Sequence, residues 1–212
     1  MKIKFKKYWR KSSFKKKKDG VFILNHIKKI KPKNFLEIGV FHGVTSRNVC
    51  ELLYILHGDQ FKFTGIDLFE NDTEKLKEEI APKTTFLNPL KTIYYKYIIR
   101  LDPYSHQSVL KLLNKFKRNI NIIKGNSNDV LREIKTDIFD YVFLDGGHKY
   151  ETVKNDLENL TEVINKNGTI LCDDYNLSYI PGVRKAIDEY VLNKNFNLKI
   201  LNSRFAEITK KI

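Results

Sequence analysis

The stretch FLEIGVFHGVTS, residues 35–46, decides how this chain folds. Its apolar start, FLEI, is typical of a buried strand and runs directly into two glycines, Gly39 and Gly43. Thr45 and Ser46 follow where a helix is expected to begin. This order of strand, glycine loop and helix is typical of a nucleotide-binding loop, although the spacing of the glycines is unusual.

Further along the chain, apolar strands alternate with helical segments. Strands are expected at residues 34–39, 61–68, 120–125, 140–147, 169–174, 196–201 and 204–209, and helices at 20–31, from the glycine loop to about 56, and at 73–80, 105–117, 150–164 and 182–192. Pro32 is expected to stop the first helix, and Gly168 to break the chain before the fifth strand. The alternation predicts a three-layer, Rossmann-like α/β fold with a mostly parallel seven-stranded sheet. Because no helix separates the last two strands, they are expected to form an antiparallel hairpin.

The composition is that of one globular domain. The chain has 212 residues, of which 42% are hydrophobic, and this length is sufficient for one large core. No apolar run approaches the roughly 20 residues of a membrane span, and the N-terminus lacks the apolar core of a secretory signal. We therefore expect a cytoplasmic protein without a membrane span. Cys50 and Cys172 are expected to be reduced core thiols.

The net charge of +14 is concentrated at one end of the chain. Residues 1–18 carry ten Lys or Arg and no acid, and the other 194 residues have a net charge of +4. We therefore divide the chain into a basic N-terminal tail, 1–18, and a domain, 19–212. The tail is expected either to contact nucleic acid, an anionic surface or an acidic partner, or to be a solvated, partly disordered arm.

The residues around the glycine loop suit a ligand without a pyrophosphate. The pattern E-x-G-x-x-x-G-x-T-S lacks the middle glycine of the dinucleotide fingerprint. Glu37 is placed to attract an ammonium group, and Thr45 and Ser46 to bond a carboxylate. Asp67 ends the second strand, where an acidic residue can accept both ribose hydroxyls. The alternative is that the two glycines only make a tight turn.

The segment GNSNDVL, 125–131, follows the third strand. Ser127 and Asn128 carry donors and acceptors that suit the edge of an adenine. The alternative is that one of these two residues is the N-cap of a helix that runs through Leu131.

Acidic residues follow two strands that are expected to be neighbours. Asp145 ends the fourth strand, and Asp173 and Asp174 end the fifth, so three carboxylates are expected to converge. Such a cluster requires a proton or a cation, and oxygen ligands favour Mg²⁺, with Ca²⁺ or Mn²⁺ as alternatives. His148 is placed to take a proton from a substrate hydroxyl near neutral pH. Alternatively, Asp145 caps the next helix and DGGH is an ordinary turn.

The runs ExGxxxGx[ST], GIDL, GxSxDxL, FLDGGHxYE and CDDY resemble the class I S-adenosylmethionine-dependent methyltransferases, and among them the metal-dependent O-methyltransferases. The resemblance covers about residues 20–210. One related branch contains the catechol-type enzymes, which have a lysine base where this chain has His148. The other contains small methyltransferases with a DGGHxY signature, related to macrolide and aminocoumarin sugar O-methyltransferases. The second branch is closer in DGGHKYE and in DDYNLSYIPGVRKAIDEY.

The resemblance implies a methyltransferase fold, S-adenosyl-L-methionine as cofactor, and a divalent metal, Mg²⁺. It implies methylation of a hydroxyl on a small molecule or saccharide, with His148 and Asp145 as catalytic residues. Together with the loop analysis, it places the cofactor against Glu37, Gly39, Gly43, Thr45, Ser46, Asp67, Ser127, Asn128 and Asp145. The implied metal ligands are Asp145, Asp173 and Asp174. Gly146 and Gly147 stand where the sugar enzymes have an acidic residue.

Residues 70–118 are predicted to be a substrate lid inserted in the methyltransferase domain. Its expected lining combines aromatic and cationic side chains, namely Tyr94, Tyr95, Tyr97, Arg100, Tyr104 and His106. The alternative is a helical insertion that packs its own aromatic residues. Two other functions stay open, an RNA methyltransferase that uses the tail and a cofactor-binding module without catalysis. A homodimer also stays open.

Overall fold

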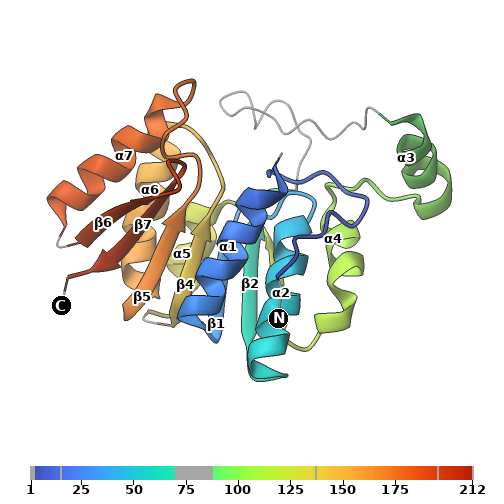
Figure 1. Cartoon of the computed structure of the whole chain (residues 1–212), viewed down its shortest axis with the longest axis horizontal. Helices are drawn as coiled ribbons and strands as arrows, with labels where there is room; N and C mark the ends of the chain where they lie inside the picture. The colour runs from blue at the N-terminus through green and yellow to red at the C-terminus, as the bar shows by residue number, and fades with distance from the viewer. Residues whose placement is uncertain (1–2, 15, 70–87, 137, 195, 212) are drawn as a thin grey trace.

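The centre of the molecule is one sheet of seven strands in the order β3-β2-β1-β4-β5-β7-β6 (Figure 1). The computed structural model describes residues 3–14, 16–69, 88–136, 138–194 and 196–211. The strands are β1 (Asn34–Ile38), β2 (Lys62–Asp67), β3 (Ile120–Lys124), β4 (Phe139–Leu144), β5 (Ile164–Cys172), β6 (Phe196–Leu201) and β7 (Phe205–Lys210). Strands β1 to β5 are parallel, and β7 is antiparallel to β5 and β6. The predicted fold class is therefore confirmed, including the C-terminal hairpin.

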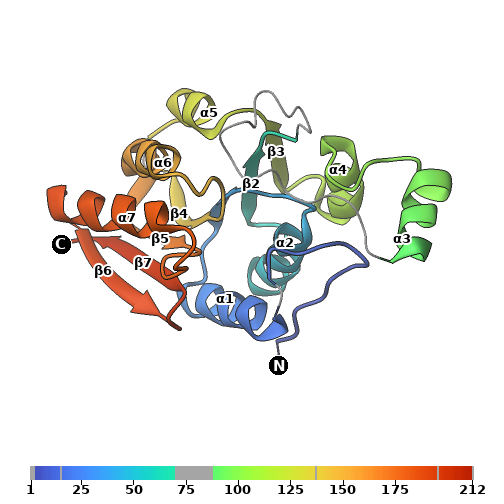
Figure 2. The ribbon, with the colours of Figure 1, turned by 90° about the horizontal axis from the view of Figure 1, so that it is seen from above.

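Helices cover both faces of the sheet and make three layers (Figure 2). They are α1 (Lys17–Ile30), α2 (Val44–His57), α3 (Pro89–Ile93), the π-helical turn η1 (Tyr94–Ile99), α4 (His106–Leu113), the 3-10 turn η2 (Asn114–Phe116), α5 (Ser127–Glu133), α6 (Tyr150–Val163) and α7 (Pro181–Asn193). Successive residues of β1 point to opposite faces of the sheet and belong to two separate hydrophobic cores. Phe35 packs with α1, α2 and α4, whereas Leu36 packs with α5, α6 and α7. The predicted arrangement of one sheet between two layers of helices is thus confirmed.

The chain reverses its direction across the sheet between β1 and β4. From β1 it moves outward through β2 to β3, and it then returns to place β4 on the other side of β1. The Asp145 amide donates to the Ile38 carbonyl oxygen at 2.9 Å, so the ends of β1 and β4 lie side by side. In open α/β sheets this topological switch point is where ligands bind.

Several predicted boundaries differ from those observed. Helix α1 begins at Lys17, so the last two residues of the predicted tail are helical. Gly168 lies inside β5 and does not break the chain. The predicted helix at 105–117 is confirmed as α4 and η2, whereas the predicted helix at 73–80 lies outside the described residues. Cys50 and Cys172 are buried free thiols, as predicted.

The first residues that the structure describes are packed against the domain. Phe5 and Phe14 are buried, and the Phe14 ring contacts the rings of Phe143 and Phe205. The side chain of Asn48 on α2 bonds both the amide and the carbonyl of Lys6. The interpretation of the tail as a solvated arm is therefore wrong for residues 3–14, because its two phenylalanines belong to the core.

None of the helices in the described ranges is long and apolar enough to cross a membrane, in agreement with the sequence.

Candidate active site

The glycine loop holds the ends of β1 and β4 close together. Gly39 has φ +91°, and a Cβ atom there would lie 2.0 Å from the carbonyl oxygen of Asp145. Gly43 has φ +71° and is the N-cap of α2. Both glycines are therefore required by the turn itself, because L residues rarely adopt these angles and the first site has no space for a side chain. The alternative that the two glycines make a tight turn is therefore confirmed, and it does not conflict with a ligand-binding role of the loop.

Glu37 lies completely buried beneath this loop. The Ser46 hydroxyl donates a hydrogen bond to Glu37 Oε2, whereas Oε1 has no hydrogen-bond partner among the described residues. Burial raises the pKa of Glu37 to about 8, although the Ser46 hydrogen bond opposes the shift. Thr45 is also buried, in the first turn of α2. Glu37 thus places a buried carboxyl group with one unbonded oxygen beneath the loop.

Asp67, at the end of β2, accepts hydrogen bonds from the protein through both oxygens. Oδ2 accepts from the Phe41 amide at 2.7 Å, and Oδ1 accepts from the Phe69 amide at 3.2 Å. The Tyr104 hydroxyl also donates to Oδ1, at 2.8 Å. The carboxylate is therefore oriented by two backbone amides, and a side-chain hydroxyl lies where a ribose hydroxyl is expected to bind.

Ser127 and Asn128 make their side-chain contacts with α6. The Ser127 hydroxyl donates to Asp156 Oδ1 at 2.5 Å, and Asn159 Nδ2 donates to Asn128 Oδ1 at 3.2 Å. The N-cap of α5 is Asn126, whose side chain accepts from the Asn128 amide. The proposed cap at Ser127 or Asn128 is therefore wrong by one or two residues. An adenine contact from these two residues stays a prediction.

Asp156 is a buried acidic residue that the sequence analysis missed. It lies on the face of α6 that carries the buried residues Val153, Leu157 and Leu160. A carboxylate on the apolar face of an amphipathic helix is the signal that would have identified it, because buried polar groups require partners.

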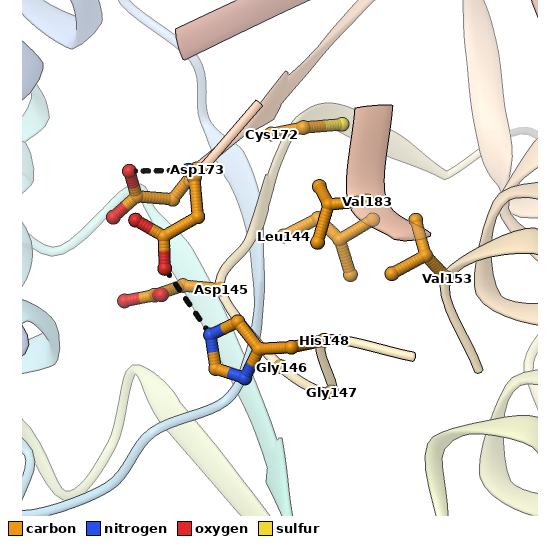
Figure 3. Close-up of a pocket in the computed structure, with 10 residues that line it drawn as sticks. Leu144, Asp145, Gly146, Gly147, His148, Val153, Cys172, Asp173 and Val183 are labelled. Carbon is orange, nitrogen blue, oxygen red and sulfur yellow. Dashed lines mark hydrogen bonds and ion pairs between the residues drawn. The ribbon is translucent and has the colours of Figure 1, made fainter. Parts of the chain in front are cut away.

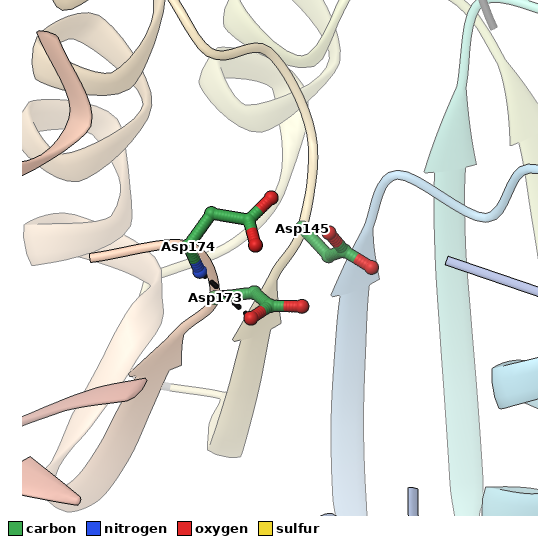
Figure 4. A group of neighbouring side chains, drawn as sticks. All are labelled: Asp145, Asp173 and Asp174. Atoms are coloured by element: carbon green, nitrogen blue, oxygen red, sulfur yellow. Dashed lines mark hydrogen bonds between the residues drawn. The ribbon is translucent and has the colours of Figure 1, made fainter. Parts of the chain in front are cut away.

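The three predicted aspartates converge at the carboxyl ends of β4 and β5 (Figure 4). One oxygen from each of Asp145, Asp173 and Asp174 lies within 4.8 Å of the others. Figure 3 shows the His148 ring directed toward this cluster, and its Nε2 lies 3.1 Å from Asp174 Oδ2. The N-cap of α6 is Lys149, so the alternative role of Asp145 as a helix cap is wrong.

The pocket beside this cluster lies between the ends of β4 and β5 and the starts of α6 and α7. It is lined by Leu144, Asp145, Gly146, Gly147, His148, Val153, Cys172, Asp173, Asp174 and Val183. The pocket therefore combines the four candidate polar side chains with an apolar wall.

Arg204, which the sequence analysis also missed, lies against the aspartate cluster. Its guanidinium bonds both oxygens of Asp173, and its Nη2 lies 3.1 Å from Asp174 Oδ1. Its Nη1 lies 3.4 Å from Asp19 Oδ2, on α1. One guanidinium therefore faces several carboxylates, a planar geometry that arginine provides and lysine does not.

The positive charge of Arg204 does not neutralise the negative charge of the three carboxylates. Burial, together with the charge of Asp174, raises the pKa of Asp173 to about 6 even though Arg204 opposes the shift. Burial also raises the pKa of Asp145 well above its usual range, and the charges of Asp173 and Asp174 add to this effect. The cluster therefore favours the uptake of protons or of a further cation.

The N-terminal segment 3–14 reaches this site. Arg10 is buried, and its guanidinium donates to three backbone carbonyl oxygens at 2.8–3.2 Å, those of His42, Pro103 and Ser108. The Ser13 side chain lies beside the Asp145 carboxylate and opposes the rise in its pKa. These contacts connect the segment to the glycine loop, to α4 and to the aspartate cluster.

The predicted lid is described only from residue 88 onward. Tyr95 and Tyr104 are buried, and His106 Nε2 lies 2.8 Å from the Ile122 carbonyl oxygen. Helix α4 packs on the sheet through the buried residues Val109 and Leu113. Tyr95, Tyr104 and α4 are therefore packed in the domain, whereas the rest of α3 and η1 is exposed or partly exposed, and the lid role of residues 70–118 stays a prediction.

Comparison with known proteins identifies the family. Residues 36–175 match a family described as a methyltransferase domain. No curated protein sequence shows a significant match.

Solved structures of methyltransferases share the fold. The S-adenosylhomocysteine-bound methyltransferase PaMTH1 of Podospora anserina has a TM-score of 0.63 and 15% identity, over 94% of this chain and 80% of that chain. The O-methyltransferase NovP has a TM-score of 0.64 and 17% identity, over 91% and 81%. CalS11, a TDP-rhamnose 3′-O-methyltransferase, has a TM-score of 0.59 and 15% identity, over 91% and 78%. Because the family match covers well over half of the chain and spans the glycine loop, Asp67 and the aspartate cluster, this protein belongs to the methyltransferase domain family and has the class I methyltransferase fold.

Proposed function

We propose that this protein transfers a methyl group from S-adenosyl-L-methionine to a hydroxyl oxygen of a small molecule or saccharide, assisted by Mg²⁺. The observation that carries the proposal is the convergence of His148 with the three aspartates at the ends of β4 and β5. This cluster adjoins the glycine loop at the topological switch point, where a bound cofactor and an acceptor hydroxyl can meet.

The loop residues fit the cofactor. The unused Glu37 Oε1 is an acceptor for the ammonium group of a methionine moiety. Asp67 already accepts a hydroxyl, from Tyr104, and a ribose would replace that contact. Thr45 is the candidate for the methionine carboxylate, because the Ser46 hydroxyl already donates its proton to Glu37, and Ser127 and Asn128 are the candidates for the adenine. When bound, the cofactor supplies a methyl group on a sulfonium leaving group.

The aspartate cluster fits a hard divalent cation. Carboxylate oxygens are the ligands that Mg²⁺ prefers, and the cluster retains an excess of negative charge beside Arg204. Because Arg204 engages both oxygens of Asp173, and Asp174 lies between Arg204 and His148, Asp145 is the more available ligand. A metal bound there would lower the pKa of a coordinated hydroxyl and orient it.

His148 is the candidate base. It takes the proton of the acceptor hydroxyl, and Asp174, 3.1 Å from its Nε2, stabilises the imidazolium that forms. Gly146 and Gly147 stand where the sugar O-methyltransferases have the acidic residue that takes this role. Leu144, Val153 and Val183 form the apolar wall of the pocket beside His148.

A saccharide is the favoured acceptor. The support is the DGGHKYE signature, together with the shared fold of CalS11, which acts on TDP-rhamnose.

The test is the transfer of tritium from methyl-labelled S-adenosylmethionine to a panel of nucleotide sugars and catechols, with Mg²⁺ or with EDTA. The wild type is expected to label at least one acceptor, and EDTA to abolish the labelling. His148→Ala is expected to lower kcat by roughly 10²–10⁴-fold. His57→Gln, at the opposite end of α2, is expected to leave kcat unchanged. Equal rates for His148→Ala and wild type would contradict the role of His148, and equal rates with EDTA would contradict the metal.

A further inference from the structure

The helical stretch formed by α3 and η1 exposes its apolar side chains. From residue 89 to residue 99, Tyr95 is the one buried residue. Figure 1 shows α3 beyond α4, at the rim of the molecule. With Trp9 it forms what we call the outer patch, whose members are 51–68% exposed: Trp9, Leu90, Ile93, Tyr97 and Ile98. Large apolar side chains gathered at one place on a surface mark an interaction site more often than single ones do.

Two segments that are far apart in the sequence build this patch. The Trp9 and Tyr94 rings lie edge to face, with centroids 6.0 Å apart. The Lys91 ammonium lies 5.9 Å from the Trp9 ring, and the Arg10 guanidinium lies 5.8 Å from the Tyr95 ring. Because Arg10 is also anchored in the domain through three carbonyl oxygens, the Trp9 backbone is held beside η1.

The same two segments carry almost all of the net charge. Residues 1–18 and 88–100 together contain thirteen Lys or Arg and no acid. The rest of the chain has 26 basic and 25 acidic residues, a net charge of only +1 out of the total of +14. Cations such as Lys91, Lys96 and Arg100 are thus interleaved with the exposed apolar residues. A partner for this surface must be anionic and must also accept aliphatic side chains.

We propose that the outer patch docks this protein on the surface of an anionic phospholipid bilayer. Leu90, Ile93 and Ile98 enter the boundary between headgroups and acyl chains, Trp9 and Tyr97 lie at headgroup level, and the lysines face the phosphates. The aliphatic residues distinguish a bilayer from single-stranded RNA, because bases stack on aromatic rings and on arginine but not on leucine or isoleucine.

Docking goes beyond the proposed methyl transfer, and it needs neither the cofactor nor the aspartate cluster. The N-terminal segment connects the two regions, since Ser13 contacts Asp145 only four residues after Trp9. A docked molecule would therefore hold its active site close to the bilayer.

The full-length protein contains its own probe, because Trp9 is the single tryptophan of the chain. The experiment titrates the protein with vesicles of phosphatidylcholine alone and with vesicles that contain about 30% phosphatidylglycerol, which creates a negative surface potential. We expect Trp9 emission to shift to the blue, and brominated acyl chains to quench it, with the anionic vesicles only. Cosedimentation measures the partition coefficient.

Two sets of variants separate apolar insertion from charge. Leu90→Ser/Ile93→Ser/Ile98→Ser is expected to abolish the blue shift. The matched control Leu192→Ser/Ile200→Ser changes exposed apolar residues outside the patch and is expected to bind like wild type. Lys91→Gln/Lys96→Gln/Arg100→Gln is expected to weaken partitioning by roughly 100-fold, at about fivefold per charge. All substituted side chains are at the surface or partly exposed, and circular dichroism checks that each variant is folded.

Three outcomes would overturn the proposal. One is the absence of a Trp9 shift with anionic vesicles. Another is equal vesicle binding by the Leu90/Ile93/Ile98 variant and by its control. The third is tight binding of Trp9 to poly(U) without any response to vesicles, which would assign the patch to RNA.

Discussion

The Arg204 guanidinium donates two hydrogen bonds to the Asp173 carboxylate, 2.5 Å from Nε to Oδ1 and 2.7 Å from Nη2 to Oδ2. This contact joins the turn before β7 to the end of β5, and it places a positive charge inside the aspartate cluster. Asp173 is almost completely buried. Its charge therefore depends on Arg204 in the folded protein.

Replacing Arg204 with Met is expected to lower the free energy of unfolding by about 3–5 kcal/mol, because it leaves a buried carboxylate without its partner. The matched control is Arg184→Met, which breaks an exposed pair with Asp188 and is expected to cost less than about 1 kcal/mol. Urea unfolding measures both. Similar losses for the two variants would show that Arg204 does not support the cluster.

Mg²⁺ is expected to raise the melting temperature of the wild type, because a ligand that binds only the folded state stabilises it. Asp145→Asn and Asp174→Asn are expected to remove this shift. Asp129→Asn, at an exposed position in the first turn of α5, is the control that should retain it. Thermal unfolding with and without Mg²⁺ gives the comparison. A Mg²⁺ response that survives in the Asp174→Asn variant would place the metal elsewhere.

Glu37 is expected to make stability depend on pH. Its pKa is raised from 4.5 to about 8 in the folded protein, so the folded state retains a proton that the unfolded chain releases near pH 4.5. The stabilising effect is complete below pH 4.5 and is lost as the pH rises toward 8, at about 1.4 kcal/mol per pH unit. Glu37→Gln should lack this slope and be the more stable protein above pH 8. Urea unfolding at a series of pH values tests this, and a constant difference between the two proteins would contradict it.

Gly39→Ala is expected to destabilise the protein by about 3 kcal/mol or more, since its Cβ would lie 2.0 Å from the Asp145 carbonyl oxygen. Gly58→Ala is the control, because Gly58 also has a positive φ but no atom lies within 4 Å of the added Cβ. Gly58→Ala should lower the free energy of unfolding by about 1 kcal/mol, which is the cost of the positive φ without a steric clash. Chemical denaturation of both variants separates the clash from the backbone angle, and equal losses would argue against the close approach of β1 and β4.

The sequence predicted the strand ends well, because a buried parallel strand is a short apolar run with a clear last residue. Asp145, Asp173 and Asp174 each follow such a run, so their convergence follows from the topology. The role of Arg204 could not be predicted from the sequence, because its partner Asp173 is 31 residues away. Nothing in the residues around Arg204 marks its side chain as a partner of a buried carboxylate.

The N-terminal segment was misjudged for a related reason. Ten cations in eighteen residues indicate solvent exposure, whereas Phe5 and Phe14 within the same segment are buried in the core. Lysine side chains can bury their stems and keep their charges in water, so a basic segment can pack as well as any other. The hydrogen bond from Tyr104 to Asp67 was not predicted, because it depends on the fold of the whole 88–105 segment.

The most direct test of the central claim is calorimetric titration of S-adenosylhomocysteine into the wild type and into Asp67→Asn. We expect the wild type to bind one equivalent, and Asp67→Asn to bind roughly 10–100-fold more weakly, because a charged hydrogen-bond acceptor for the ribose is lost. No binding heat from folded wild-type protein would contradict the assignment of this site to S-adenosylmethionine.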